Sequence, residues 1–220
     1  MKYDVIIVGA GPAGYFCAYE LAEKDPSKKI LLIDRGRDIH KRNCPVLNHK
    51  LEKCPVNKAG YRECYPACSI TSGFGGAGAY SDGKFNITTE FGGWLQNYIS
   101  NKELLSLINY VDDINLAFGA TPVITDPNTP KVKEIEHRAM SVGVKLLRSK
   151  VRHLGTEENL KILSKIFAHL ETKIDMIFGE KVEEIIVENN KIKGIVMDNG
   201  KNYDAEYVVL AVGREGSEWL

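Results

Sequence analysis

Residues 3–14, YDVIIVGAGPAG, decide the fold of this chain. Their first six residues are a short apolar run rich in β-branched side chains, which is typical of a buried parallel strand. Gly9, Gly11 and Gly14 then form the pattern G-x-G-x-x-G, and a helical pattern continues to Lys24. The order of strand, glycine turn and helix predicts a dinucleotide-binding fold.

Each glycine of this turn has its own physical purpose. The first permits the tight turn, the second lets the backbone approach a pyrophosphate, and the third lets helix and strand pack closely. The helix start offers unpaired N–H groups and the positive end of its dipole to an anion. Asp34 closes a second apolar strand twenty residues after Gly14, where it can accept a hydrogen bond from a ribose hydroxyl. The alternative is a simple tight turn, which this context disfavours.

The chain after the second strand does not continue as a plain nucleotide fold. Residues 36–93 show no strong period and are rich in Cys, Pro and Gly. Helical patterns return at 102–118 and 131–141, and a third begins at Thr156. The three patterns predict a helical region inserted into the nucleotide fold.

Three apolar runs end the chain: VEEIIVE at 182–188, KIKGIVM at 191–197 and YVVLAVG at 207–213. Asn-Asn separates the first two runs, and Asp-Asn-Gly follows the second. Asn-Gly is the strongest short hairpin signal. We therefore expect the first two runs to pair in a meander and the third to enter the main sheet as a buried strand.

The stretch 73–84, GFGGAGAYSDGK, has almost no side-chain bulk at its centre. Such a backbone can press against a flat ring, and Ser81, Asp82 and Lys84 would add polar groups beside it. A flexible linker is the alternative, but linkers are seldom interrupted by aromatic residues such as Phe74. We favour a backbone that cradles a ring.

This organisation resembles the FAD domain of the glutathione-reductase-like flavoproteins. In that family a three-strand meander precedes an A-T-G-like turn near the FAD adenosine, and here the turn is Ala211-Val212-Gly213. A valine that opens the meander offers its backbone to the adenine there, and Val182 has the matching place. Asp34 departs from the glutamate common in the family, although the shorter carboxylate can make the same ribose contact.

A closer resemblance lies in RNCPVLNHK at 42–50 and CSITSGFGGAGAYSDGKFN at 68–86, taken together with GAGPAG. These stretches are similar to uncharacterised bacterial and archaeal FAD-dependent dehydrogenases, a group related to the NAD(P)/FAD-dependent oxidoreductases. Members of that group are longer and continue into a substrate domain and a late Gly-Asp motif. The resemblance therefore implies a C-terminally truncated gene product or a fragment.

We predict an α/β fold in which a Rossmann-like FAD-binding domain, with a parallel sheet and a β-meander, is built from residues 1–95 and 177–220. Residues 96–176 form an inserted, incomplete helical or substrate region. The cofactor-binding residues are predicted to be Gly9, Ala10, Gly11, Pro12, Ala13, Gly14, Asp34, Arg35, Arg42, Gly75, Gly76, Ser81, Asp82, Gly83, Val182, Ala211, Val212 and Gly213.

The predicted function is that of an FAD-dependent oxidoreductase, a dehydrogenase or reductase that passes hydride to or from the flavin N5, with NAD(P)H as a candidate electron donor. The substrate and the catalytic acid or base are not predicted. One alternative is a truncated, catalytically inert FAD-binding fragment. Another is an NAD(P)-only dehydrogenase domain, which would require a continuous β-α-β series after Asp34.

Four of the five cysteines, Cys44, Cys54, Cys64 and Cys68, cluster in one turn-rich segment. Zinc and iron–sulfur sites usually contain a C-x2-C pair, which is missing here. We favour reduced thiols and no metal, and keep a zinc or iron–sulfur site and a redox-active pair as alternatives. The five histidines form no motif.

The charge balance disfavours several classes of partner. Lys plus Arg and Asp plus Glu are both 29, without the basic balance or basic run of a nucleic-acid binder. No stretch approaches the ~20 consecutive apolar residues of a membrane span, and the N-terminus is not a signal peptide. We expect a cytoplasmic protein with a small-molecule substrate, no nucleic-acid or membrane partner, and an unpredicted oligomeric state.

Overall fold

The structure is a computed structural model in which residues 2–55, 64, 66–217 and 219 are described. They form two compact units, Met1–Tyr80 with Leu163–Leu220, and Ser81–Ile162. These boundaries differ from the predicted division at 95/96 and 176/177, and the assignment of functions to the two parts stays a prediction. Part of the irregular segment predicted at 36–93, namely 56–63 and 65, lies outside the described residues.

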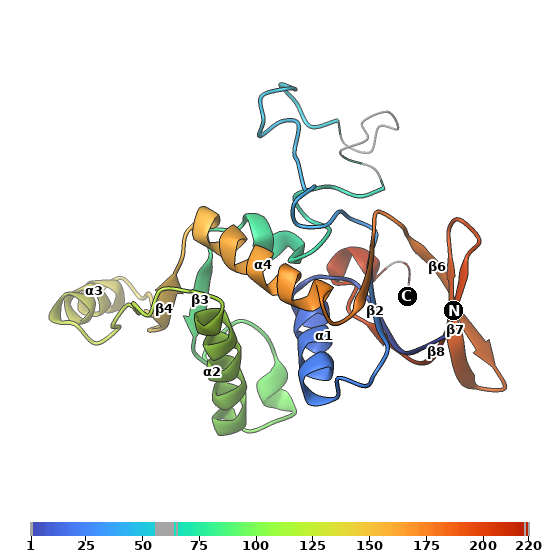
Figure 1. Cartoon of the computed structure of the whole chain (residues 1–220). Helices are drawn as coiled ribbons and strands as arrows, with labels where there is room; N and C mark the ends of the chain where they lie inside the picture. The colour runs from blue at the N-terminus through green and yellow to red at the C-terminus, as the bar shows by residue number, and fades with distance from the viewer. Residues whose placement is uncertain (1, 56–63, 65, 218, 220) are drawn as a thin grey trace. The chain divides into compact units, whose positions relative to one another are not determined.

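The first unit contains a six-stranded sheet in the order β5-β2-β1-β8-β7-β6. Figure 1 labels its strands β2, β6, β7 and β8. Its parallel strands are β1 (Lys2–Val8), β2 (Ile30–Asp34), β5 (Asp175–Phe178) and β8 (Asn202–Leu210). β1 pairs in parallel with β2 and β8, and β2 pairs in parallel with β5. The α/β class with a mainly parallel sheet is therefore confirmed.

The meander is formed by β6 (Val182–Glu188), β7 (Lys191–Met197) and β8, with antiparallel pairing throughout. The turn between β6 and β7 has positive φ at both Asn189 (51°) and Asn190 (59°), as a type I′ turn requires. The entry of β8 into the main sheet is thus confirmed. Its predicted burial is wrong, because only Ala205 of this strand is buried and Tyr207 is 61% exposed.

Helix α1 (Pro12–Lys24) packs on β1 and β2. It ends where Asp25 precedes proline, which disfavours helical geometry in the preceding residue. The central strands supply the core, since every residue of Ile30–Ile33 is buried. Phe74, 0% exposed, lies against Tyr15 and Phe167 at centroid distances of 5.4 and 5.1 Å. The glycine-rich stretch is therefore anchored in this core.

The second unit carries the predicted helices α2 (Asn101–Ala117) and α3 (Pro130–Met140), and the first half of α4 (Thr156–Glu171). A short ribbon of β3 (Lys84–Ile87) and β4 (Lys150–His153) was not predicted. The one-turn helices are η2 (Gly76–Tyr80) and η4 (Arg214–Gly216) in the first unit and η3 (Leu95–Asn97) in the second. In the described part of the chain, no helix is both long and apolar enough to cross a membrane.

Candidate functional site

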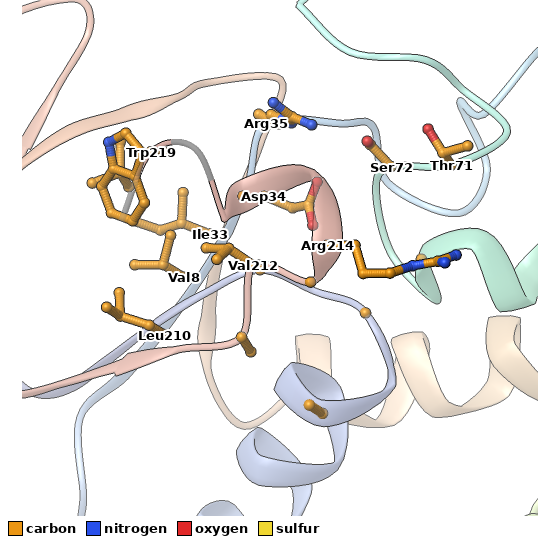
Figure 2. Close-up of a pocket in the computed structure, with 18 of the residues that line it drawn as sticks. Val8, Ile33, Asp34, Arg35, Thr71, Ser72, Leu210, Val212, Arg214 and Trp219 are labelled. Atoms are coloured by element: carbon orange, nitrogen blue, oxygen red, sulfur yellow. The ribbon is translucent and has the colours of Figure 1, made fainter. Parts of the chain in front are cut away.

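A cavity of about 610 Å³ opens in the first unit at the carboxyl ends of β1, β2 and β8 (Figure 2). This is the edge of a parallel sheet at which open α/β folds bind their ligands. The predicted site residues that line it are Gly9, Gly11, Pro12, Ala13, Asp34, Arg35, Gly76, Val182, Ala211, Val212 and Gly213. The structure thus brings together residues from both ends of the chain.

The first and third glycines of the turn are required by packing. The backbone N of Ala211 donates to the Val8 carbonyl at 2.8 Å, which places the turn after β8 against the turn after β1. A Cβ added at Gly9 would lie 2.3 Å from the Ala211 carbonyl oxygen, and one at Gly14 would lie 1.8 Å from the Gly9 oxygen. Neither position accommodates a side chain.

Gly11 differs from both, because a Cβ there would make a single contact, at ordinary van der Waals distance. Within 4 Å it would meet only the Cα of Gly76, at 3.9 Å. Gly11 is also the N-cap of α1, which has no side-chain cap and no acidic residue in its first turn. The unpaired N–H groups and the dipole of α1 therefore remain available to an anion. This cradle fits the diphosphate of a dinucleotide.

The carboxylate of Asp34 joins three loops around the cavity. Its Oδ2 accepts from the backbone N of Ala10 at 2.7 Å, while Oδ1 accepts from Gly36 N at 2.7 Å and Gly73 N at 2.9 Å. A carboxylate offers about four lone-pair sites, so about one remains beside the three backbone bonds. The ribose contact stays a prediction, and Oδ2 is the oxygen with the spare site.

Arg42 does not line the cavity, in contrast to its predicted place in the cofactor site. It is 5% exposed, and its guanidinium donates to the backbone carbonyls of Ser69 (2.9 Å), Ile70 (2.7 Å), Phe74 (2.7 Å) and Gly76 (2.8 Å). Burial lowers the pKa of this guanidinium. Through these bonds Arg42 fixes the loop that carries Gly76 to the cavity wall.

Other predicted residues also lie off the cavity. Ala10, Gly14 and Gly75 sit behind the turn, where Gly75 N donates to the Ala10 carbonyl at 2.8 Å. Ser81, Asp82 and Gly83 belong to the second unit. Their predicted position beside the flavin ring stays a prediction.

Asp82 is the centre of a small exposed charge cluster in that unit. Its carboxylate accepts from Lys84 Nζ at 2.6 Å and lies 3.0 Å from His153 Nε2. The hydrogen bond from Lys84 and, after it, the one with His153 lower the pKa of Asp82 to about 2. The sequence showed no motif around His153, because its partner is 71 positions away.

Several residues at the cavity were missed by sequence reasoning: Thr71, Ser72, Glu180, Lys181, Arg214 and Trp219. Most of them adjoin a predicted feature. Thr71 and Ser72 precede the glycine-rich stretch, and Arg214 follows Gly213 directly. These residues could have been predicted as polar neighbours of the predicted turns. No sequence signal marked Trp219, because its Nε1 donates to the carbonyl of Glu183, a residue distant in the sequence, at 2.9 Å.

The clustered cysteines do not line the cavity. Cys54 and Cys68 are exposed, and Cys44 is half-buried. Among the described residues, no group of three or more His, Cys, Asp or Glu side chains could hold a metal ion. The geometry therefore gives the zinc and iron–sulfur alternatives no support.

The parallel sheet, the glycine turn and the meander that returns to it define a dinucleotide-binding flavoprotein fold. The family model for pyridine nucleotide-disulphide oxidoreductases matches residues 3–141, more than half of the chain, and the chain belongs to this family. The model for glucose inhibited division protein A matches residues 159–219. No curated protein matches the chain significantly. The family confirms the predicted class, FAD-dependent oxidoreductase, with FAD as its cofactor.

Two solved structures share this fold. L-amino acid deaminase from Proteus vulgaris is 12% identical with a TM-score of 0.50, over 96% of this chain and 47% of that one. A mutant of E. coli quinol fumarate reductase FrdA is 14% identical with a TM-score of 0.51, over 97% of this chain and 33% of that one. The chain thus spans about half of the length of the deaminase and about a third of that of the fumarate reductase subunit.

Proposed function

We propose that the chain binds FAD at the cavity of the first unit and serves an oxidoreductase reaction of a small molecule. The observation that carries this proposal is the room at Gly11, the N-cap of α1, where a Cβ would fit, whereas Gly9 and Gly14 are packed tightly. A tight turn alone would need no such space. A diphosphate held by the N–H groups of the helix would need that space.

In this proposal each part of the cavity wall contacts one part of the cofactor. The backbone of Gly11, Pro12 and Ala13 faces the diphosphate, and Oδ2 of Asp34 accepts from a ribose hydroxyl. The backbone of Val182 lies at the adenine end. FAD, when bound, supplies hydride transfer at N5 of its ring.

The reaction partner is proposed to be a small-molecule substrate, with NAD(P)H as candidate electron donor, and the location to be cytoplasmic. The balance of 29 basic and 29 acidic residues supports the proposal that neither nucleic acid nor a membrane is a partner. Reduction of the bound flavin by NADH or NADPH would favour the enzyme, whereas binding without reduction by either would favour the catalytically inert alternative.

FAD affinity in Gly11→Ala tests this proposal, measured by quenching of flavin fluorescence. The new Cβ has room in the protein but occupies the space meant for the diphosphate. We expect FAD affinity to fall about tenfold or more, ~1.4 kcal/mol, with only the small loss of thermal stability that alanine causes at an N-cap. Gly14→Ala is the contrast: its Cβ meets the Gly9 oxygen, so it should lose stability together with affinity. Unaltered FAD affinity in Gly11→Ala, or no FAD binding by the wild type, contradicts the proposal.

A further inference from the structure

Three cationic side chains line the cavity, and they differ in their partners. Lys181 Nζ donates to the Glu183 carboxylate at 3.0 Å, and Arg35 takes part in another interaction within the chain. For the guanidinium of Arg214, by contrast, the described residues provide no hydrogen-bond or ion-pair partner. Among the described residues, Arg214 therefore brings to the cavity wall a guanidinium without an ion-pair partner.

The acidic residues of the same wall, Asp34 and Glu180, form no ion pair with Arg214 and have other partners. Both oxygens of Asp34 accept backbone N–H groups. Glu180 accepts from Asn199 Nδ2 at 2.8 Å and lies 4.0 Å from Lys201 Nζ. The cavity wall thus presents a cation that is available to an anionic ligand.

The backbone fixes where this cation lies. Arg214 begins η4 directly after Gly213, whose φ of 66° turns the chain at the end of β8. The same turn is held against β1 by the bond from Ala211 N to the Val8 carbonyl. In Figure 2 the side chain of Arg214 reaches from this turn toward the side of the cavity formed by η2, which begins at Gly76. Arg214 and the glycine turn therefore border the same space.

The start of α1 by itself is a weak partner for a diphosphate. A helix N-terminus acts as roughly half a positive charge, whereas a diphosphate carries about two negative charges. A guanidinium offers paired N–H donors that match phosphate oxygens. One arginine, together with the helix N-terminus, would offset most of the negative charge of the diphosphate.

We propose that Arg214 is a binding residue for the cofactor's diphosphate, acting together with the N-terminus of α1. This inference rests on the proposed function, because it concerns the same cavity. It adds that the phosphate groups, and not only the adenosine, are recognised by the closing turn of the fold. Arg214 then makes the site selective for nucleotides over nucleosides.

Calorimetric titration of the full chain with ADP and with adenosine at low salt tests the inference. Arg214→Gln should bind ADP about 10- to 100-fold more weakly, as expected for loss of a charge-assisted hydrogen bond, and adenosine within about twofold of the wild type. Arg214→Lys, which keeps the charge without the paired donors, should fall between the two. Lys24→Gln is the matched control, since it removes an exposed positive charge at the opposite end of α1, and should change neither affinity.

Two outcomes overturn the inference. One is an ADP affinity of Arg214→Gln equal to that of the wild type. The other is an equal loss for ADP and adenosine, which would show that Arg214 shapes the pocket without contacting phosphate. Should the wild type bind neither FAD nor ADP, the proposed function fails and the inference fails with it. Circular dichroism of each variant verifies that the fold is retained, and Arg214→Lys carries the test if Arg214→Gln unfolds.

Discussion

Among the residues that the structure describes, each unit buries one arginine, and the two guanidinium groups have different kinds of partner. In the first unit, the partners of the Arg42 guanidinium are four backbone carbonyls. In the second unit, Arg152 forms a bidentate pair with Asp112, Nε to Oδ1 and Nη2 to Oδ2, both at 2.7 Å, and also donates to the Thr121 carbonyl. One charge holds a loop in shape, and the other ties helix α2 to strand β4.

The loops near the cavity are held by charged side chains that bind backbone groups. Asp34 repeats the pattern of Arg42 with the opposite sign, because it binds backbone N–H groups of three loops. Charge-assisted hydrogen bonds are roughly twice as strong as neutral ones. Loops without a regular ladder can therefore be held rigidly near the glycine turn. The second unit uses its buried charges for packing two regular elements.

The largest expected effect comes from Arg42→Met. The variant keeps an unbranched apolar stem but leaves four carbonyls without their donor, so we expect the free energy of unfolding to fall by about 4 kcal/mol. Urea unfolding followed by circular dichroism measures it. Arg138→Met, at an exposed arginine of α3, is the control and should change stability by less than about 0.5 kcal/mol. Equal stabilities of the two variants would break the comparison.

A smaller loss is expected for Arg152→Met, about 3 kcal/mol, because it leaves the buried carboxylate of Asp112 unpaired. The double variant Asp112→Leu with Arg152→Met removes both charges and should recover most of this loss. Arg42 has no single partner that could be changed to the same effect. The same urea titrations complete the double-mutant cycle. A double variant less stable than either single variant would show that the pair is not the source of the loss.

The smallest effect on stability is expected for the exposed charge cluster of Asp82, in contrast to the two buried arginines. Its pKa is lowered from the usual 3.8 to about 2, first by Lys84 and then by His153. A carboxylate with a lowered pKa stabilises the fold above its ordinary pKa, and that contribution is lost as the pH falls from about 4 toward 2. NMR titration of the Asp82 carboxyl should show its midpoint rising in Lys84→Met. An unchanged midpoint would contradict the conclusion that Lys84 lowers the pKa of Asp82.

The sequence predicted the elements whose patterns are long or punctuated by clear turns. β1, α1, β2 and the three strands of the meander were all expected, as were the helices from 102, 131 and 156. β4 and β5 were missed because each has four residues, too few to show a period. β5 joins β2 from more than 140 positions away, and nothing local marks that pairing.

The cavity was predicted where its residues belong to a motif. The glycine turn, Asp34, Val182 and the turn at Ala211–Gly213 all line it. Arg42 lies off the cavity wall for a physical reason: its partners are backbone atoms, which every residue carries, so no sequence pattern reveals them. Arg214 was missed for a related reason, since its significance depends on which charges nearby are already satisfied.

We propose that the turn after β1 and the turn after β8 hold one adenine-linked diphosphate between them. Backbone amide NMR of the chain titrated with ADP tests it most directly. We expect the amide resonances of Gly11, Ala13, Val182 and Gly213 to shift together with a single affinity, while those of Ser81–Ile162 stay in place. Unshifted resonances at Gly11 and Gly213, or shifts confined to the second unit, would contradict it.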